Sequence, residues 1–304
     1  MSKLHWLAIS TLPGIGGATA QKLIERFGSV EAAFAAPDEE LLRVPRFTAE
    51  VVARLRAVSL EAIEAELASL ADEGLQVVTW DDEDYPANLR LVYDAPPVLF
   101  VRGELRPTDA QAVAIVGTRH PTPQGVAVAE RLARELAERG LTVVSGLALG
   151  IDTVAHRGAL QAAGGRTLAV PGSGLRAIHP RENIALAEAI ARRGALLSEL
   201  HPDTPARGPS LMARDRIISG LSRAVIVVEA EEKSGSLDTA AKARRQGRLL
   251  FAVPGSPGTQ ALITGGAEPL DLQANDLDRL SQRIRTHTPG PGQRNLSEGS
   301  SLLQ

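Results

Sequence analysis

Short apolar runs rich in β-branched residues recur along the chain, and each run ends in glycine, serine or another small polar residue. The runs do not alternate with polar residues, which is typical of strands buried on both faces of a parallel sheet. They occupy residues 112–119, 141–152, 166–174, 224–236 and 249–256. Amphipathic segments between and around them predict helices over 124–139, 153–163, 180–193, 214–221 and 237–246. Strands that alternate with helices predict an α/β fold, a Rossmann-like, doubly wound and mostly parallel sheet.

The regions before and after these runs have a different pattern. Residues 1–72 show helical spacing of apolar residues and predict a small all-helical domain. Strand-like segments at 75–80 and 97–103 begin the sheet domain, which we expect to cover residues 73–282. The proline-containing stretch between these two segments is expected to lie on the surface. Residues 283–304, rich in proline, glycine and serine, predict a flexible tail.

Composition narrows the chemistry. The net charge of the 304 residues is −3, so any contact with nucleic acid must come from a local basic patch, such as the excess of Lys and Arg between 204 and 250. The absence of cysteine excludes disulfides and cysteine-based metal sites, and the six histidines show no metal-ligand spacing. We therefore expect no metal and no cofactor. No signal-like or membrane-spanning segment is recognisable, which favours a cytoplasmic protein.

Small residues at strand ends indicate an anion-binding edge. They let backbone N–H groups approach a phosphate, and the helix that follows directs its positive end to the same place. An arginine there can hold a phosphate through two parallel hydrogen bonds, although it could instead cap a helix or pair with Glu130. The candidate residues are Gly117, Thr118, Arg119, Ser145, Gly146, Gly172, Ser173, Gly174, Ser234, Gly235 and Ser236.

Two other constellations have competing interpretations. Ser145, Asp152 and His156 suggest a hydrolase, but the serine is not in a Gly-x-Ser-x-Gly elbow and the other two share one predicted helix. Asp152 is better placed as a helix N-cap, so we predict no catalytic residue. The turn at 12–16 fits a helix-hairpin-helix motif, and 44–47 looks like a degenerate copy. Such turns can hold a DNA phosphate, or serve only for packing or for a protein partner.

The segments VAIVGTR, VVSGLALGIDTVAH, RTLAVPGSGL, RDRIISGLS, VVEAEEKSGSLDTA and FAVPGSPGT occur in this order between 113 and about 270. Together they resemble the DNA-processing protein A family, also called Smf. The helical N-terminal part is similar to that family's SAM-like or helix-hairpin-helix domain. The resemblance implies a bacterial, cytoplasmic, homodimeric protein that binds single-stranded DNA and loads the RecA recombinase in natural transformation and recombination. It also implies that the protein is not an enzyme.

The resemblance assigns roles to particular residues. Arg119 would grip phosphate, supported by Gly117 and Thr118, with Ser145 and Gly146 lining the same groove. Arg214 and Arg216 would lie beside it. The chain departs from the family's Phe-Pro-x-Arg-Asn-Arg at Leu211 and Asp215.

These departures have physical consequences. Leucine cannot stack on a base. Asp215 is expected to be ionised, and either to hold both neighbouring arginines in place or to repel the bound strand. The family's C-terminal winged-helix domain is expected to be absent or removed.

Two other functions remain open from the sequence. A nucleotide phosphoribohydrolase of the lysine-decarboxylase-like class has a similar sheet and a phosphate loop where this chain has residues 234–242. Lys242 stands where hydrolysis needs a carboxylate, which argues against that reaction. A structural protein with a vestigial nucleotide fold would leave Arg119 without a role.

Overall fold

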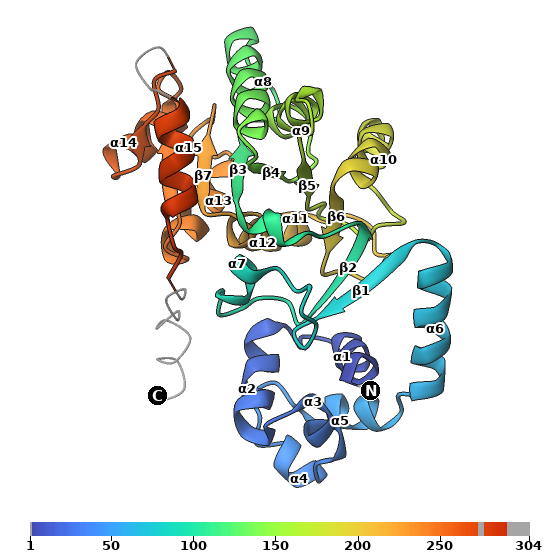
Figure 1. Ribbon diagram of the computed structural model, residues 1–304. Coiled ribbons are helices and arrows are strands. Elements are labelled where there is room, and N and C mark those ends of the chain that lie inside the picture. The colour runs from blue at the N-terminus through green and yellow to red at the C-terminus, as the bar shows by residue number, and fades with distance from the viewer. Residues whose placement is uncertain (1, 273–276, 291–304) are drawn as a thin grey trace.

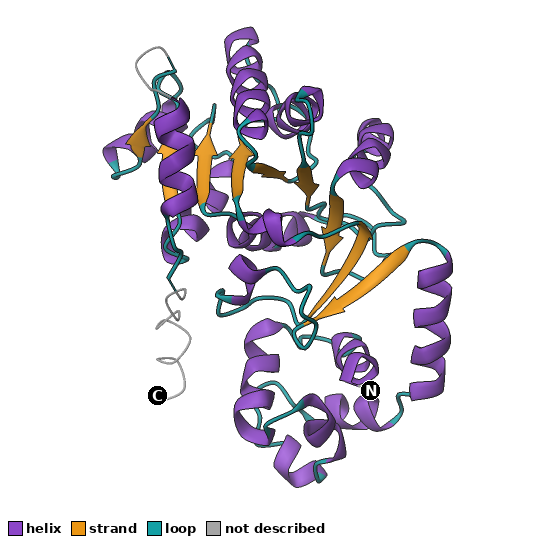
Figure 2. Cartoon of the chain, viewed as in Figure 1, coloured by secondary structure: helices purple, strands orange, loops and turns teal. Residues whose placement is uncertain are grey.

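One nine-stranded sheet organises the molecule, with the strand order β1-β2-β6-β5-β4-β3-β7-β8-β9 (Figures 1 and 2). The computed structural model describes residues 2–272 and 277–290. Strands β3 to β9 run parallel, and β1 and β2 form an antiparallel edge against β6. Their bounds are β1 Leu75–Thr79, β2 Val98–Gly103, β3 Ala112–Val116, β4 Thr142–Ser145, β5 Thr167–Ala169, β6 Ala195–Ser198, β7 Ala224–Val227, β8 Leu249–Ala252 and β9 Glu268–Pro269. The predicted Rossmann-like architecture is confirmed.

The direction of winding reverses at β3. Strands β4, β5 and β6 follow on one side of it, and the chain then returns to place β7, β8 and β9 on the other side. In open parallel sheets a crevice forms at the carboxyl ends of the two strands where the order reverses, and ligands bind there. The loops after β3 and β7 therefore lie at the position where this fold class binds its ligands.

Helices cover both faces of the sheet. Val113 and Ile115 of β3 pack with α8 (Pro123–Glu138), α9 (Ile151–Gln161) and α15 (Leu277–Thr286). The alternate β3 residues face α7 (Ala87–Arg90), α12 (Asp215–Leu221) and α13 (Ser236–Arg245). The remaining elements of this part are η1 Pro107–Ala110, η2 Arg181–Asn183, α10 Ile184–Arg193, α11 Gly208–Ala213 and α14 Pro257–Thr264. None of the described helices is long and apolar enough to cross a bilayer.

The N-terminal part is all helical, as predicted, and gathers beyond the β1 edge of the sheet (Figure 1). Its helices are α1 Ser2–Ser10, α2 Gly17–Phe27, α3 Val30–Ala35, α4 Asp38–Leu41, α5 Ala49–Arg56 and α6 Leu60–Asp72. It shares one apolar core with β1, β2, β6 and α10. Trp6 is 1% exposed, stacks edge-on with Trp80 at 5.3 Å and donates a hydrogen bond to Asp81 at 2.6 Å.

The stretch between β1 and β2 was predicted to lie on the surface, and only part of it does so. Tyr85 is 2% exposed, and its hydroxyl donates to the Pro96 carbonyl at 2.8 Å. The Asn88 amide donates to the carbonyls of Ala110 and Leu221. The prediction holds for exposed residues such as Glu83, Asp84 and Leu91, but Tyr85 and Asn88 are buried because their side chains satisfy backbone carbonyls.

Several elements were not predicted, and one boundary moves. Strand β6 was missed because its apolar run, residues 195–197, is only three residues long, and α11, α14 and α15 were also missed. Helix α15 continues past residue 282, where the predicted tail begins, because Ile284 is fully buried against the sheet domain. The remainder of that predicted tail, residues 291–304, lies outside the described residues.

The contact between the helical part and the sheet part gives a first prediction. A Cβ atom at Gly17 would lie 2.0 Å from the Ala95 carbonyl oxygen, whereas one at Gly16 would meet nothing within 4 Å. The Ala95 carbonyl cannot rotate out of the way as a flexible side chain can, so Gly17→Ala should lower the free energy of unfolding by about 2–3 kcal/mol. The matched Gly16→Ala should cost less than about 1 kcal/mol. Urea denaturation measures both, and equal losses would contradict the proposed contact.

Candidate functional site

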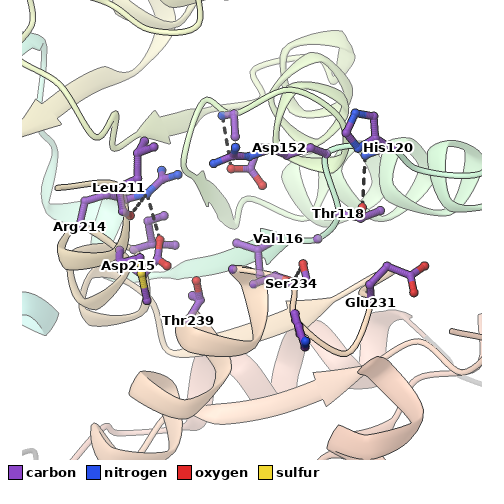
Figure 3. Close-up of a pocket in the computed structure, with 18 residues that line it drawn as sticks. Val116, Thr118, His120, Asp152, Leu211, Arg214, Asp215, Glu231, Ser234 and Thr239 are labelled. Atoms are coloured by element: carbon purple, nitrogen blue, oxygen red, sulfur yellow. Dashed lines mark hydrogen bonds and ion pairs between the residues drawn. The ribbon is translucent and has the colours of Figure 1, made fainter. Parts of the chain in front are cut away.

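A pocket of about 430 Å³ opens at the carboxyl ends of β3 and β7 (Figure 3). It lies at the switch point of the sheet and is lined by the loops that follow these two strands together with α11, α12 and the start of α13. Seven of the predicted residues line it: Gly117, Thr118, Arg119, Arg214, Ser234, Gly235 and Ser236. The lining residues that the sequence did not single out as site residues include Val116, His120, Ala148, Asp152, Met212, Ile218, Glu231, Lys233 and Thr239.

The loop after β3 is held by backbone contacts on both sides. The Thr118 N–H donates to the Glu229 carbonyl at 2.7 Å, and the Thr118 carbonyl accepts from the Ile151 N–H at 3.1 Å. A Cβ at Gly117 would lie 2.6 Å from the Ile151 side chain, and one at Gly150, where φ is +79°, would lie 2.4 Å from the Thr118 carbonyl. Both positions therefore require glycine. These contacts hold the loop in a single backbone conformation.

Arg119 extends from this fixed loop into solvent at the pocket. It makes no hydrogen bond or ion pair with any residue that the structure describes. Glu130, the alternative partner considered from the sequence, instead accepts a hydrogen bond from Gln161 at 2.8 Å. The guanidinium of Arg119 is therefore available to an incoming anion.

Arg214 differs from Arg119 in that its guanidinium is buried in the pocket wall. The residue is 7% exposed, donates to the Val170 carbonyl at 2.6 Å and to the Leu211 carbonyl at 3.1 Å, and pairs with Asp215 at 2.9 Å. A Cβ at Gly146 would lie 1.6 Å from its Nη1 atom. The glycine thus leaves room for the guanidinium.

Two buried carboxyl groups surround Arg214. Burial raises the pKa of Asp152, and the charge of Arg214 opposes that shift. Burial also raises the pKa of Asp215 to about 6, again against the charge of Arg214. The pocket wall therefore holds one cation and two acids whose ionised forms are disfavoured by burial.

The predicted N-cap role of Asp152 was wrong. Helix α9 begins at Ile151, one residue earlier, so Asp152 lies in its first turn. Its carboxylate accepts hydrogen bonds from the N–H groups of Gly146 at 3.1 Å and Ala148 at 3.4 Å. It therefore orders the loop before the helix.

Arg216 points away from the pocket. It forms two 2.6 Å hydrogen bonds to Glu199 and one of 3.1 Å to the Asp94 carbonyl. Residues two apart on a helix point about 200° apart around its axis, so Arg214 and Arg216 cannot enter one pocket. The expectation that Asp215 holds both arginines was wrong, because Asp215 contacts Arg214 alone.

Four other predicted residues lie behind the pocket and do not line it. The Ser145 hydroxyl is buried and donates to the Ile115 carbonyl at 2.7 Å. Ser173 is fully buried, and its hydroxyl has no hydrogen-bond partner among the residues that the structure describes. Gly172 lies against Leu211, and Gly174 lies against the carbonyls of His201 and Pro202. Both contacts are too close to admit a side chain. Their contact with DNA stays a prediction.

His156 has a structural environment. It is fully buried, its Nδ1 lies 2.7 Å from the Thr167 hydroxyl, and that hydroxyl donates to the Val143 carbonyl. Nδ1 is consequently the protonated nitrogen. Burial lowers the pKa of His156 to about 3, so the ring is neutral and does not contact Ser145 or Asp152 as a catalytic base would.

The other wall of the pocket is the start of α13. Ser234 lies just before this ten-residue helix and Ser236 is its first residue, and their hydroxyls contact each other at 2.9 Å. The free N–H groups at a helix N-terminus carry partial positive charge and bind anions. No group of three or more potential metal-ligating side chains occurs in residues 2–272 and 277–290. The arrangement is suited to binding an anion.

Comparison with known proteins agrees with this architecture. Residues 76–282 match the family model of DNA recombination-mediator protein A, and residues 7–58 match the SAM-like helix-hairpin-helix tandem. DNA processing protein DprA of Bacillus subtilis is 41% identical over 229 residues, which cover 73% of this chain and 77% of that protein.

Two solved structures are similar to this one. The structure of DNA processing protein A from Streptococcus pneumoniae is 33% identical with a TM-score of 0.77, covering 88% of this chain and 94% of that one. A structure of DNA processing protein A from Helicobacter pylori, solved to describe the single-stranded DNA binding mode of that protein, is 32% identical with a TM-score of 0.62. The match covers 70% of this chain and 98% of that one.

The fold thus defines a Rossmann-like protein with an appended helix-hairpin-helix tandem and a pocket at the switch point of its sheet. The chain belongs to the DNA recombination-mediator protein A family, that of the DprA and Smf proteins. The resemblance seen in the sequence is confirmed.

Asp215 gives a prediction about pH. Its pKa is about 6 in the folded protein against an ordinary 3.8, so the folded state binds its proton more tightly and stability falls as pH rises through this range. Asp215→Asn removes this titration. Relative to the variant, the parent should lose about 1–3 kcal/mol of unfolding free energy between about pH 4 and pH 7.

Urea unfolding of both proteins across that pH range measures the difference. The exposed Asp84 gives the control, and Asp84→Asn should follow the parent at every pH. A parent-to-variant difference for Asp215→Asn that stays constant with pH would refute this role.

Proposed function

We propose that this protein binds single-stranded DNA through the pocket at the ends of β3 and β7, protects it and loads RecA recombinase onto it in natural transformation and recombination. The observation that carries the proposal is Arg119, an exposed arginine without a partner among the described residues, fixed on a rigid loop beside a helix N-terminus. A bidentate cation and free N–H groups together favour the binding of phosphate. The single-stranded DNA binding described for the Helicobacter pylori relative supports the choice of ligand.

The composition of the pocket supports binding through phosphates in preference to base stacking. Its rim carries Leu211 and Met212, the latter 56% exposed. Among the described residues that line the pocket, the one aromatic ring is that of His120. Aliphatic side chains offer little stacking energy to a base. The sequence preference of binding should accordingly be weak.

The same environment argues against the phosphoribohydrolase alternative. Lys242, which occupies the place of that enzyme's carboxylate, is ion-paired with Asp238 and donates to the Met212 carbonyl. Of the three acids that line the pocket, Asp152 accepts two backbone N–H groups, Asp215 pairs with Arg214, and Glu231 is exposed at the rim. We propose a protein without enzymatic activity, acting as a cytoplasmic homodimer.

The first prediction concerns the kind of nucleic acid. Labelled oligo-dT should bind, blunt duplex of equal length should bind much more weakly, and affinity should fall as salt rises because bound phosphates release counterions. Fluorescence polarisation at two salt concentrations measures this. Equal affinity for duplex and oligo-dT would overturn the proposal.

The second prediction concerns Arg119. Arg119→Ala should weaken oligo-dT binding by about 1.5–3 kcal/mol through loss of a charge-assisted contact. Arg119→Lys should recover part of that loss, since an ammonium cannot reproduce the planar fork. Thermal stability should be unchanged because Arg119 has no partner in the described chain.

Arg245 supplies the matched control. It is exposed, lies on α13 outside the pocket lining, and carries the same charge. Arg245→Ala should bind as the parent does. If Arg245→Ala loses binding while Arg119→Ala retains it, the DNA site lies elsewhere.

A further inference from the structure

A pocket of about 420 Å³ lies where the helical part meets the sheet part, between α2 and the stretch that joins β1 to β2. We call it the junction pocket. Trp6 and Trp80, the two tryptophans of the chain, both line it. It shares no lining residue with the pocket beside Arg119. Its volume is within the range of ligand sites, roughly 300–1,000 Å³, and such sites often lie between the modules of a protein.

The floor of the junction pocket is apolar and aromatic. The side chains of Trp6, Val92 and Ala95 are buried, whereas Trp80 is half-buried and keeps part of its surface accessible. The two indole rings lie edge to face, with their centroids 5.3 Å apart. Among aromatic side chains, an indole attracts cations most strongly. The floor therefore suits a ligand that combines an apolar body with a positive charge.

The rim of the junction pocket carries two carboxyl groups, from Glu25 and Asp81, which are both exposed. The Oδ2 atom of Asp81 accepts the indole N–H of Trp6 at 2.6 Å, which fixes the carboxylate beside the aromatic floor. Its Oδ1 atom accepts no hydrogen bond from the residues that the structure describes. This oxygen is accordingly available to a donor that enters the pocket.

The one basic residue of the lining is already engaged. Arg90 donates hydrogen bonds to the carbonyls of Trp80 and Asp82, and its guanidinium lies over the ring of Tyr85 at 5.0 Å. It therefore holds the backbone of the loop that carries Asp81. The carboxylates of the rim are left for a cation from outside.

The acidic character extends beyond the pocket. The loop continues after Asp81 with Asp82, Glu83 and Asp84. Asp82 pairs with Lys3 at 3.3 Å, but Glu83 and Asp84 are exposed and form no hydrogen bond or ion pair with the described residues. Both line another pocket, of about 210 Å³. A surface of this charge repels phosphate and attracts cationic partners, and it is longer than one side chain, which favours a polypeptide segment.

We propose that the junction pocket docks a cationic segment of another protein, with an arginine side chain over Trp80 and between the carboxylates of Glu25 and Asp81. Arginine fits because its guanidinium both stacks on aromatic rings and pairs with carboxylates. An apolar neighbour of that arginine would pack against the floor. The inference is independent of the function proposed for the Arg119 pocket. It assigns the junction to protein recognition.

The test uses a short peptide, acetyl-Gly-Leu-Arg-Leu-Gly-amide, and its twin with glutamine in place of arginine. Because both tryptophans line the pocket, the intrinsic fluorescence of the whole protein reports on its occupancy. The arginine peptide should quench this fluorescence saturably and bind about tenfold or more tightly than the glutamine peptide, since only arginine gains the ion pairs and the cation–π contact. Free argininamide, which lacks the apolar neighbours, should bind about tenfold more weakly.

Two variants locate the site. Glu25→Gln and Asp81→Asn should each weaken the arginine peptide by about two- to fivefold, as expected for exposed ion pairs, and together by about tenfold. Asp81→Asn keeps an oxygen that can accept the Trp6 N–H, and Glu25→Gln changes an exposed residue, so both should fold. The control is Glu64→Gln, because Glu64 is exposed on α6 and lines neither of these pockets. It should bind as the parent does, as should Arg119→Ala.

Three results would overturn the proposal. Equal binding of the arginine and glutamine peptides, or no response of the tryptophan fluorescence, would show that the pocket does not recognise the cation. Unchanged binding in both Glu25→Gln and Asp81→Asn would place the peptide elsewhere. Argininamide that binds as tightly as the peptide would indicate a site for a small molecule. None of these results affects the proposed binding of DNA at Arg119.

Discussion

The geometry of the pocket depends on a close backbone contact beneath the loop that follows β3. There the chain passes between the end of β7 and the start of α9 and hydrogen-bonds to both, through Thr118. No side chain fits at Gly117 or Gly150, because carbonyl groups and Ile151 already occupy that space. The direction of Arg119, the position of α9 and the mouth of the pocket all depend on this contact. A flexible arginine on a rigid loop loses less conformational entropy on binding than one on a mobile loop.

The pocket is electrostatically layered. Its wall contains a buried arginine between two acids, so most of the charge there is compensated within the protein. Its rim contains Arg119 and Lys233, which are not neutralised in this way by any described residue. The wall therefore maintains the shape of the pocket, and the cations of the rim attract an anion. Asp215 alters the balance in the wall, where the related family pattern has an uncharged asparagine.

The sequence was sufficient for the sheet and for the edge where the pocket lies, because buried parallel strands and small residues at their ends are local patterns. It was not sufficient for the direction of individual side chains. Arg214 and Arg216 look equivalent in the sequence, yet the helix turns one inward and the other toward Glu199. Ser145 ends a strand as a ligand-binding serine would, but its hydroxyl is already bound to Ile115. Such distinctions depend on packing partners that are remote in the chain.

The apolar core that joins the helical part to the sheet, with Trp6 against Trp80, has a consequence for how the molecule unfolds. A helix-hairpin-helix tandem attached by a linker would melt as an independent unit. Here its hydrophobic face is completed by β1, β2, β6 and α10, so the tandem has no closed core without the sheet. The two other apolar cores of the sheet part contain no residue of the tandem. Loss of the tandem would therefore expose apolar residues at this one edge of the sheet to water, while the rest of the sheet keeps its cores.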